Sequence, residues 1–273
     1  MDQTKKNVTM ASVTSADGTT IGYRQLGHGP GLIIVHGGMR TSQYYLRLAE
    51  ALSETFTVSI PDRRGRGLSG AFGVGYSLAK ECADLEVLVK KTDAKFVFGH
   101  SSGGLITLQA ALELPLTKIA VYEPPLSTNG SVPSDWYPAY EKAINENKLS
   151  EAFSIVIKGL QMVDKGSKFK PIDQAIVRRR PDLQELLELV PTFEQDTLLV
   201  NELESKKDRF RKIEAETLLL GGSKSPGFLR SALRELEETI PRVLRIEFLG
   251  LDHNGPDRKA PLRIAEELRR FFL

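Results

Sequence analysis

The sequence has little cysteine, no long apolar run and no tract of a single charge, and each absence excludes a class of protein. Its single cysteine, Cys82, cannot form an internal disulfide or a thiolate metal cluster. No apolar run reaches the ~18 residues of a transmembrane helix, and the first residues do not resemble a signal peptide. The 37 Lys and Arg residues nearly balance 35 Asp and Glu residues, without a basic tract. We therefore expect a cytoplasmic globular protein that binds a small molecule, and neither nucleic acid nor a membrane.

Short apolar runs alternate with helical patterns along most of the 273 residues. The pair Asp17-Gly18 between two extended segments predicts a β-hairpin. Short, mainly apolar runs are typical of strands buried on both faces, and they lie at 32–35, 56–60, 96–98, 119–122, 218–220 and 243–248. Helical spacing predicts helices over 78–91, 102–114 and 261–272. The alternation predicts an α/β fold with a mostly parallel central sheet and helices on both faces.

One stretch breaks this alternation. Residues 126–213 contain no convincing strand, whereas helical spacing recurs over 150–163 and 182–189. We expect a helical cap at 126–213, inserted between two late strands of a core formed by residues 1–125 and 214–273.

The segment Gly99-His100-Ser101-Ser102-Gly103 is a G-x-S-x-G pattern that follows an apolar strand and opens a helix. In this context the pattern predicts a sharp strand-to-helix turn that exposes the Ser101 hydroxyl near a helix N-terminus, where negative charge is favoured. The glycines keep the neighbouring backbone from colliding across the turn. The alternative is a glycine-rich turn without chemistry.

Small residues also follow the strand at 32–35, in His36-Gly37-Gly38-Met39. They allow backbone N–H groups to approach a substrate carbonyl, and we expect the N–H groups of Gly38 and Ser102 to bind an oxyanion. A glycine pair used only for turning is the alternative.

The candidate general base follows from elimination among four histidines. His100 adjoins the candidate nucleophile and is expected to point elsewhere, His36 belongs to the strand end, and His28 precedes that strand. His253 follows the last predicted strand, at the carboxyl edge where open α/β sheets place their sites. An imidazole with an ordinary pKa near 6.5 suits proton transfer from a serine.

Taken together and in order, these motifs resemble those of the α/β-hydrolase fold superfamily, in its capped serine hydrolase, esterase-like branch. The resemblance extends from about residue 11 to residue 273. It includes the segment PDRRGRGLS at 61–69 and the segment GLDH at 250–253, which matches the loop that supplies the catalytic histidine. It implies a Ser-His-acid triad with neither a metal nor an organic cofactor.

The triad acid departs from the commonest pattern of that family. Ser225 stands where most relatives have an aspartate, and no carboxylate occurs between Thr217 and Arg234. Some members place the acid after the strand that follows the nucleophile helix, and Glu123 occupies that position here. The alternatives are that Glu123 only binds loop N–H groups, or that a dyad is oriented by water or Ser225.

Other residues receive non-catalytic interpretations. Arg63, Arg64 and Arg66 could bind an anionic group, but we expect a solvated loop cluster. Asp62 is expected to tie this loop by hydrogen bonds. Cys82 lies on an apolar helical stripe and is expected in the core.

In the cap, Trp136 and Tyr140, together with Met39 of the oxyanion segment, are candidate substrate-binding residues, or they only pack. The sequence therefore predicts a carboxylesterase-like serine hydrolase of an ester, lactone or related acyl bond. A C–C hydrolase or lyase on the same site, and a non-catalytic ligand-binding protein, stay open. The sequence also leaves open whether the chain forms a homo-oligomer.

Overall fold

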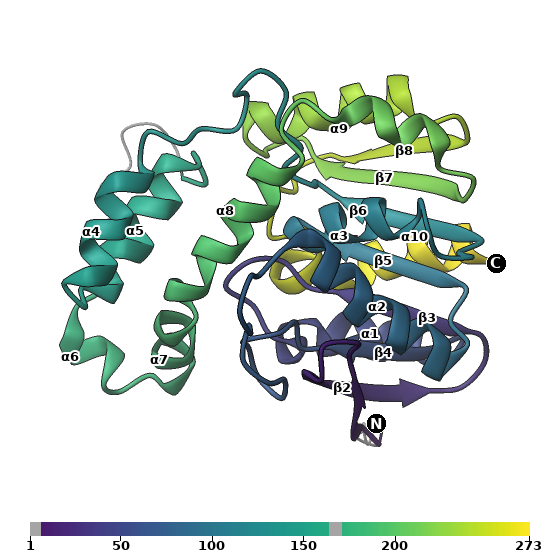
Figure 1. The fold of residues 1–273 in the computed structure, drawn as a ribbon, viewed down its shortest axis with the longest axis horizontal. Helices are drawn as coiled ribbons and strands as arrows, with labels where there is room; N and C mark the ends of the chain where they lie inside the picture. The colour runs from purple at the N-terminus through teal and green to yellow at the C-terminus, as the bar shows by residue number, and fades with distance from the viewer. Residues whose placement is uncertain (1–6, 164–170) are drawn as a thin grey trace.

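A mixed, mostly parallel sheet of eight strands lies at the centre of the computed structural model, which describes residues 7–163 and 171–273 (Figure 1). The strands are β1 (Thr9–Thr14), β2 (Thr20–Gly27), β3 (Gly31–Val35), β4 (Thr57–Pro61), β5 (Phe96–His100), β6 (Lys118–Tyr122), β7 (Glu216–Gly222) and β8 (Val243–Phe248). Their spatial order is β1-β2-β4-β3-β5-β6-β7-β8. Among these described strands, the β1–β2 and β2–β4 pairs are antiparallel and the other five pairs are parallel. The predicted fold class is confirmed.

The predicted hairpin joins β1 to β2. Thr14 pairs with Thr20, and Gly18 in the intervening turn has a φ of +86°, which glycine adopts without the strain of a side chain. The β2 strand then pairs with β4, so the hairpin forms one edge of the sheet and leaves the site-bearing strands β3, β5 and β6 in its centre.

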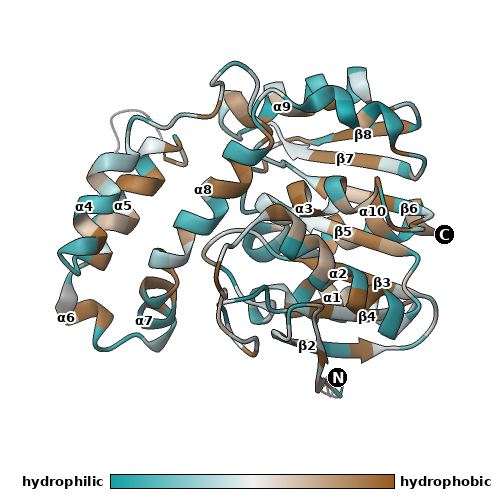
Figure 2. Ribbon diagram, viewed as in Figure 1, coloured by the Kyte–Doolittle hydropathy of each residue, from teal (hydrophilic) through white to brown (hydrophobic). Residues whose placement is uncertain are grey.

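Helices cover both faces of the sheet because the parallel strands are apolar on both sides. On one face, α1 (Leu46–Leu52) and α10 (Pro261–Phe272) pack against strand residues. On the other face lie α2 (Leu78–Thr92), α3 (Ser102–Ala110) and α9 (Gly227–Thr239). Figure 2 shows the apolar residues following the central strands, whereas much of α9 is hydrophilic. None of the described helices is long and apolar enough to cross a membrane.

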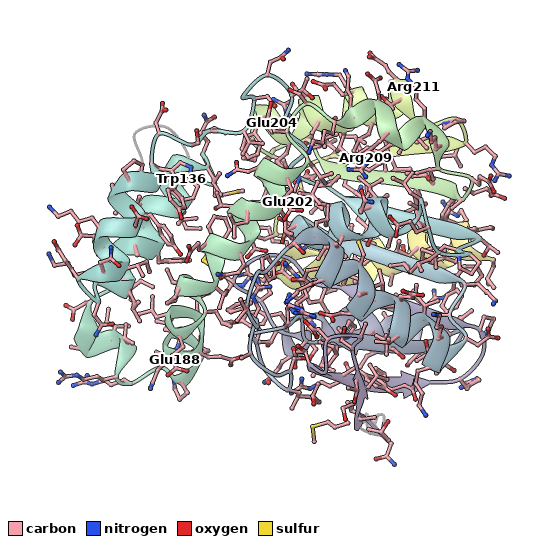
Figure 3. The ribbon with its side chains drawn as sticks, viewed as in Figure 1. Trp136, Glu188, Glu202, Glu204, Arg209 and Arg211 are labelled. Carbon is pink, nitrogen blue, oxygen red and sulfur yellow. The ribbon has the colours of Figure 1, made fainter. Side chains whose placement is uncertain are left out.

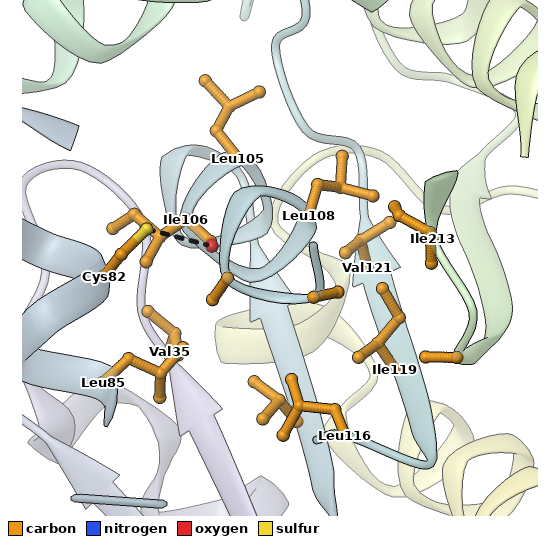
Figure 4. Close-up of a cluster of buried hydrophobic side chains, with 14 of the residues drawn as sticks. Val35, Cys82, Leu85, Leu105, Ile106, Leu108, Leu116, Ile119, Val121 and Ile213 are labelled. Carbon is orange, nitrogen blue, oxygen red and sulfur yellow. Dashed lines mark hydrogen bonds between the residues drawn. The ribbon is translucent and has the colours of Figure 1, made fainter. Parts of the chain in front are cut away.

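The core on the α2 and α3 side contains Cys82, as the sequence predicted. Its side chain is 8% exposed and packs among apolar residues such as Val35, Leu85 and Ile106 (Figure 4). Burial raises the pKa of the Cys82 thiol. Because a thiol must ionise to act as a nucleophile, Cys82 is a packing residue.

Between β6 and β7, the described residues of 126–213 form helices and no strand. We call 126–213 the helical segment. Its α-helices are α4 (Tyr137–Asn145), α5 (Leu149–Gly159), α6 (Gln174–Val177), α7 (Pro181–Glu188) and α8 (Phe193–Glu202). Figure 1 shows these helices to one side of the sheet, with α8 running between α5 and the core. The helices predicted at 150–163 and 182–189 correspond to α5 and α7, although α5 ends at Gly159 and the described residues 160–163 are not helical.

The described part of the chain also contains four short helices: the 3-10 helices η1 (Ser42–Tyr45), η2 (Val190–Thr192) and η3 (Lys207–Lys212), and the single π-helical turn η4 (Gly255–Lys259). They were not predicted from the sequence, and neither were α1 and α9. The helix predicted at 102–114 also extends beyond the end of α3. The helix ends at Ala110, and tighter turns such as Glu113 N–H to the Ala110 carbonyl (3.0 Å) lead the chain towards Pro115.

Candidate active site

Ser101 lies on the tight turn between β5 and α3. Its φ of 55° and ψ of −127° are rare for a residue with a side chain. A Cβ atom at Gly99 would lie 2.3 Å from Thr107 Oγ1, and one at Gly103 would lie 2.3 Å from the Val35 carbonyl oxygen. Only glycine fits at either position, so the two glycines of the G-x-S-x-G pattern make the turn sterically feasible.

Backbone N–H groups without acceptors lie beside this turn. Gly37 N–H donates to the Tyr45 hydroxyl (3.3 Å), but Gly38 N–H has no acceptor among residues 7–163 and 171–273. Ser102 is the first residue of α3, so its N–H precedes the intrahelical hydrogen bonds. Both residues line the cavity described below. Their N–H groups are thus available to a ligand oxygen.

Glu123 and His253 are brought together from positions 130 residues apart. His253 Nδ1 lies 2.8 Å from Glu123 Oε2, and Glu123 Oε1 accepts from Gly222 N–H at 2.6 Å. The Glu123 carboxylate is fully buried, and its φ is 48°, another rare backbone conformation at the end of a strand. A carboxylate can only accept here when ionised, so Nδ1 carries the proton and Nε2 is left free to act as a base.

The loop that bears His253 is held by two side chains at the carboxyl ends of β5 and β6. The Tyr122 hydroxyl donates to the Asp252 carbonyl (2.8 Å), and His100 Nε2 donates to the His253 carbonyl (2.9 Å). His100 Nδ1 in turn accepts from the Tyr45 hydroxyl (2.6 Å). Burial, with a smaller effect of the charge on His253, lowers the pKa of His100 to about 3. His100 is therefore a neutral support of the loop.

The two other histidines also lack a place in the candidate chemistry. His36 is fully buried, and its Nε2 accepts from Arg63 N–H at 2.9 Å. Burial, followed by the charges of Arg66 and Arg63, lowers the pKa of His36 well below its ordinary value. His28 lies on the surface before β3. The elimination made from the sequence therefore agrees with these positions.

Ser101 and His253 line a cavity of about 700 Å³ between the sheet edge and the helical segment. Their side chains are not hydrogen-bonded to each other in the described structure. Met39 and Trp136 also line the cavity, whereas Tyr140 does not: its hydroxyl donates to the Val190 carbonyl (2.9 Å) and its ring packs within the helical segment. The rest of the wall is mostly apolar and includes Phe153, Val156, Ile157, Phe193 and Phe228.

Trp136 contributes to this wall from the end of α4. Figure 3 shows it among the side chains of the helical segment. Its ring centroid lies 5.8 Å from that of Phe193 on α8, and a Cβ atom at Gly159 of α5 would come within 2.3 Å of its ring. Trp136 therefore joins three helices and faces the cavity.

Two other side chains near the His253 loop, those of Asp252 and Ser225, form no hydrogen bond with the His253 imidazole. Asp252 Oδ1 accepts from Asn254 N–H (3.0 Å), and its other oxygen pairs with Lys259. Ser225 Oγ is buried and has no hydrogen-bond partner among the described residues. Glu123 is thus the acid that meets the imidazole.

The prediction of a solvated arginine cluster is wrong. The exposed fractions of Arg63, Arg64 and Arg66 are 2%, 0% and 2%. Because a buried unpaired charge costs several kcal/mol, each guanidinium has carboxylate partners. Arg64 pairs with Asp84 (2.7 Å) and Asp17 (2.9 Å).

Asp62 ties the loop that contains these arginines, as predicted. Its buried carboxylate accepts from Leu68 N–H at 2.9 Å and from Ser42 N–H at 2.5 Å. A Cβ atom at Gly67 would clash with this carboxylate, at 2.3 Å. The loop after β4 is therefore folded around Asp62.

Sequence reasoning missed Asp196, a buried carboxylate of α8 that lines the cavity. It accepts from Ser102 Oγ (2.6 Å), Arg63 Nη1 (2.7 Å) and Arg66 Nη2 (2.8 Å). Burial raises its pKa, but Arg66, Arg63 and the Ser102 hydrogen bond outweigh this, and the net pKa is lowered. No local signal marks Asp196, because its partners are 94 to 133 residues away in the sequence.

Comparison with known proteins places this geometry in a family. A model of the alpha/beta hydrolase family matches residues 32–267, and the chain belongs to that family. An alpha/beta hydrolase from Sphaerobacter thermophilus is 31% identical, with a TM-score of 0.81 over 96% of this chain and 100% of that one. The esterase RhEst1 from Rhodococcus sp. ECU1013 is 22% identical, with a TM-score of 0.74 over 96% and 98% of the two chains. At that identity the likeness to RhEst1 shows the fold alone.

Curated relatives match over shorter stretches. A cis-3-alkyl-4-alkyloxetan-2-one decarboxylase from Shewanella oneidensis is 33% identical over 107 residues, which are 37% of this chain and 34% of that protein. The uncharacterized hydrolase YraK from Bacillus subtilis is 33% identical over 102 residues, or 36% and 38% of the two chains. The match thus spans about a third of each relative's length.

Proposed function

We propose that this alpha/beta hydrolase is a serine hydrolase that cleaves an ester, lactone or related acyl bond. The observation that supports this most is the 2.8 Å contact of His253 Nδ1 with the buried Glu123 carboxylate, on the wall of the cavity that Ser101 also lines. This contact leaves His253 Nε2 free to act as a base. The family membership and the fold shared with esterases agree with hydrolysis.

In the proposed reaction, Ser101 Oγ attacks the substrate carbonyl while His253 Nε2 takes its proton. The N–H groups of Gly38 and Ser102 donate to the developing oxyanion. His253 gives the proton to the leaving group, and water then attacks the acyl-enzyme with His253 again as base. Glu123 keeps Nδ1 protonated and stabilises the imidazolium. Ser101 and His253 are not hydrogen-bonded here, and in unliganded enzymes such catalytic hydrogen bonds are often long and tighten only when substrate binds.

The helical segment serves in this proposal as a cap that selects the substrate. Most of the residues that line the cavity belong to this segment, and most of those are apolar, so the cavity favours an uncharged acyl or alkyl group over a polar one. Met39 and Trp136 are the proposed substrate contacts. Tyr140 is not a proposed substrate contact, because its side chain packs away from the cavity.

The test is hydrolysis of p-nitrophenyl esters from acetate to decanoate by the wild type and Ser101→Ala. Removal of a triad nucleophile costs on the order of 10⁴-fold or more in kcat, so we expect the variant to be near background. Ser12→Ala, at an exposed serine of β1, is the matched control and should keep full activity. Equal turnover by the wild type and Ser101→Ala would overturn the proposal.

The match to the Shewanella oneidensis decarboxylase favours a second candidate, a lyase that acts on an oxetan-2-one. An oxetan-2-one is a four-membered lactone, so the same Ser101 could meet its carbonyl. Incubation with a dialkyl oxetan-2-one distinguishes the two reactions: ring hydrolysis gives a hydroxy acid, whereas decarboxylation gives CO₂ and an alkene.

A further inference from the structure

A buried cluster of charges lies directly beside the candidate oxyanion site and has no part in the reaction proposed above. Arg63 and Arg66 come from the loop after β4, Asp196 from α8 and Glu81 from α2. Arg63 pairs with Glu81 (2.8 Å) and with Asp196 (2.7 Å), and Arg66 pairs with Asp196 (2.8 Å). Two cations therefore meet two carboxylates, and the cluster has no net charge.

Ser102 connects this cluster to the turn that bears Ser101. Its hydroxyl donates to Asp196 Oδ1 at 2.6 Å and accepts from Arg63 Nη1 at 3.0 Å. The Ser102 hydroxyl is thus held by one donated and one accepted bond. The backbone N–H of the same residue is one of the two candidate oxyanion donors.

Asp196 also contacts the other donor residue. A Cβ atom at Gly38 would lie 2.8 Å from Asp196 Oδ2 and 2.9 Å from Phe193 Cε2. The α8 helix thus packs against the bare backbone of Gly38. The carboxylate of Asp196 is hydrogen-bonded to Ser102 and lies where a side chain at position 38 would project, and it comes from the helical segment rather than from the sheet.

From this geometry, and on the basis of the proposed function, we infer that Asp196 is a positioning residue for the oxyanion hole. It holds Ser102 and the Gly38 backbone at the spacing that an oxyanion needs, and it makes this spacing depend on the docking of α8. Arg63 and Arg66 offset its negative charge, which alone would repel an oxyanion at this distance. In this role Asp196 affects the stability of the transition state, and thus kcat, and not the binding of the substrate.

Two variants separate positioning from electrostatics. Asp196→Asn keeps the size of the side chain and an acceptor for Ser102, but it removes the charge that holds both arginines. Ser102→Ala keeps every charge and the backbone N–H, and removes only the hydroxyl link, so it tests the inference even if Asp196→Asn folds poorly. Glu194→Gln is the matched control on the same helix, at an exposed position.

The readouts are kcat and KM on p-nitrophenyl butyrate and the inhibition constant of butylboronic acid, measured well below the Tm of each variant. The boronic acid forms a tetrahedral adduct on a nucleophilic serine and so reports the oxyanion site. Loss of a whole oxyanion donor costs about 10²- to 10³-fold in kcat. A displaced donor costs less, so we expect about 10- to 100-fold for Asp196→Asn and about 3- to 10-fold for Ser102→Ala. KM should change little, and the inhibition constant should rise as kcat falls.

Two results would overturn the inference while leaving the proposed function intact. One is a lower Tm with unchanged kcat and unchanged boronic acid affinity, which would mean that Asp196 only stabilises the fold. The other is a higher kcat in Asp196→Asn, which would mean that the unneutralised charges of the arginines affect the oxyanion more than the position of its donors does. If the wild type itself neither hydrolyses the ester nor binds the boronic acid, the proposed function fails and this inference falls with it.

Discussion

Replacement of Glu123 by glutamine tests the proposed triad through the tautomer of His253. Glu123 Oε1 accepts from Gly222 N–H at 2.6 Å, so the amide oxygen of the variant must take this position. The amide NH₂ then faces His253 Nδ1, where the carboxylate oxygen lay at 2.8 Å. An NH₂ group can only donate, so Nδ1 loses its proton and Nε2 gains one. The nitrogen that should accept the Ser101 proton is then blocked.

The expected loss follows from this reversed tautomer. The same carboxylate-to-amide change in a Ser-His-Asp triad lowers kcat by roughly 10⁴-fold with the geometry intact, and we expect about 10²- to 10⁴-fold here. Both buried contacts of Glu123 are replaced by amide contacts, so the free energy of unfolding should change by only about 1 kcal/mol. The assay is ester hydrolysis at neutral pH, with thermal unfolding measured in parallel.

Asp252→Asn is the matched control, since Asp252 neighbours His253 in sequence but bonds to Asn254 and Lys259. It should keep kcat within about 3-fold, in line with a surface carboxylate. Near-normal kcat/KM in Glu123→Gln, while Ser101→Ala is inactive, would refute the reasoning and favour a Ser101–His253 dyad.

Three further predictions follow from the buried polar groups and the cavity. His100 and His36 have lowered pKa values in the folded chain, so the unfolded chain binds more protons below pH ~6.5. The free energy of unfolding therefore decreases as the pH is lowered. Urea unfolding should show a loss of about 2 kcal/mol for each histidine between pH 7.5 and 5.0, and equal stability would contradict it. Trp136→Ala should shift the preferred acyl length more than kcat on the acetate ester, whereas a uniform loss would make Trp136 a packing residue. Tyr140→Phe should leave this preference unchanged and cost about 1 kcal/mol of stability in thermal unfolding.

Local signals in the sequence were sufficient to predict much of the sheet and the strand-to-helix turn that bears Ser101. The Asp-Gly turn at 17–18, the glycines around Ser101 and the proline that opens α10 each act within a few residues of the structure they specify. The position of His253 followed from its place after the last strand. Glu123 could be nominated because it also ends a strand, β6, although only its contact with His253 separates it from a structural carboxylate.

The features that sequence reasoning missed depend on contacts between distant segments. Arg66 and Asp196 are 130 residues apart, and neither shows from its neighbours that it will be buried. A run of arginines in a loop is usually solvated, so the prediction followed the common case. It was wrong here because carboxylates from distant segments cover the loop: Asp196 of α8 pairs with Arg63 and Arg66, and Asp17 and Asp84 pair with Arg64. The α8 helix was itself missed, since its sequence, FEQDTLLVNE, has only a weak apolar stripe.

The most direct test of the central claim is covalent labelling of the wild type with a fluorophosphonate, followed by intact-mass and peptide mass spectrometry. The reagent phosphonylates a serine only where a base activates its hydroxyl and donors stabilise the oxyanion. The account predicts one adduct per chain, located on Ser101, and its absence in both Ser101→Ala and His253→Ala. No adduct on the folded wild type, or an adduct that persists in Ser101→Ala, would contradict it.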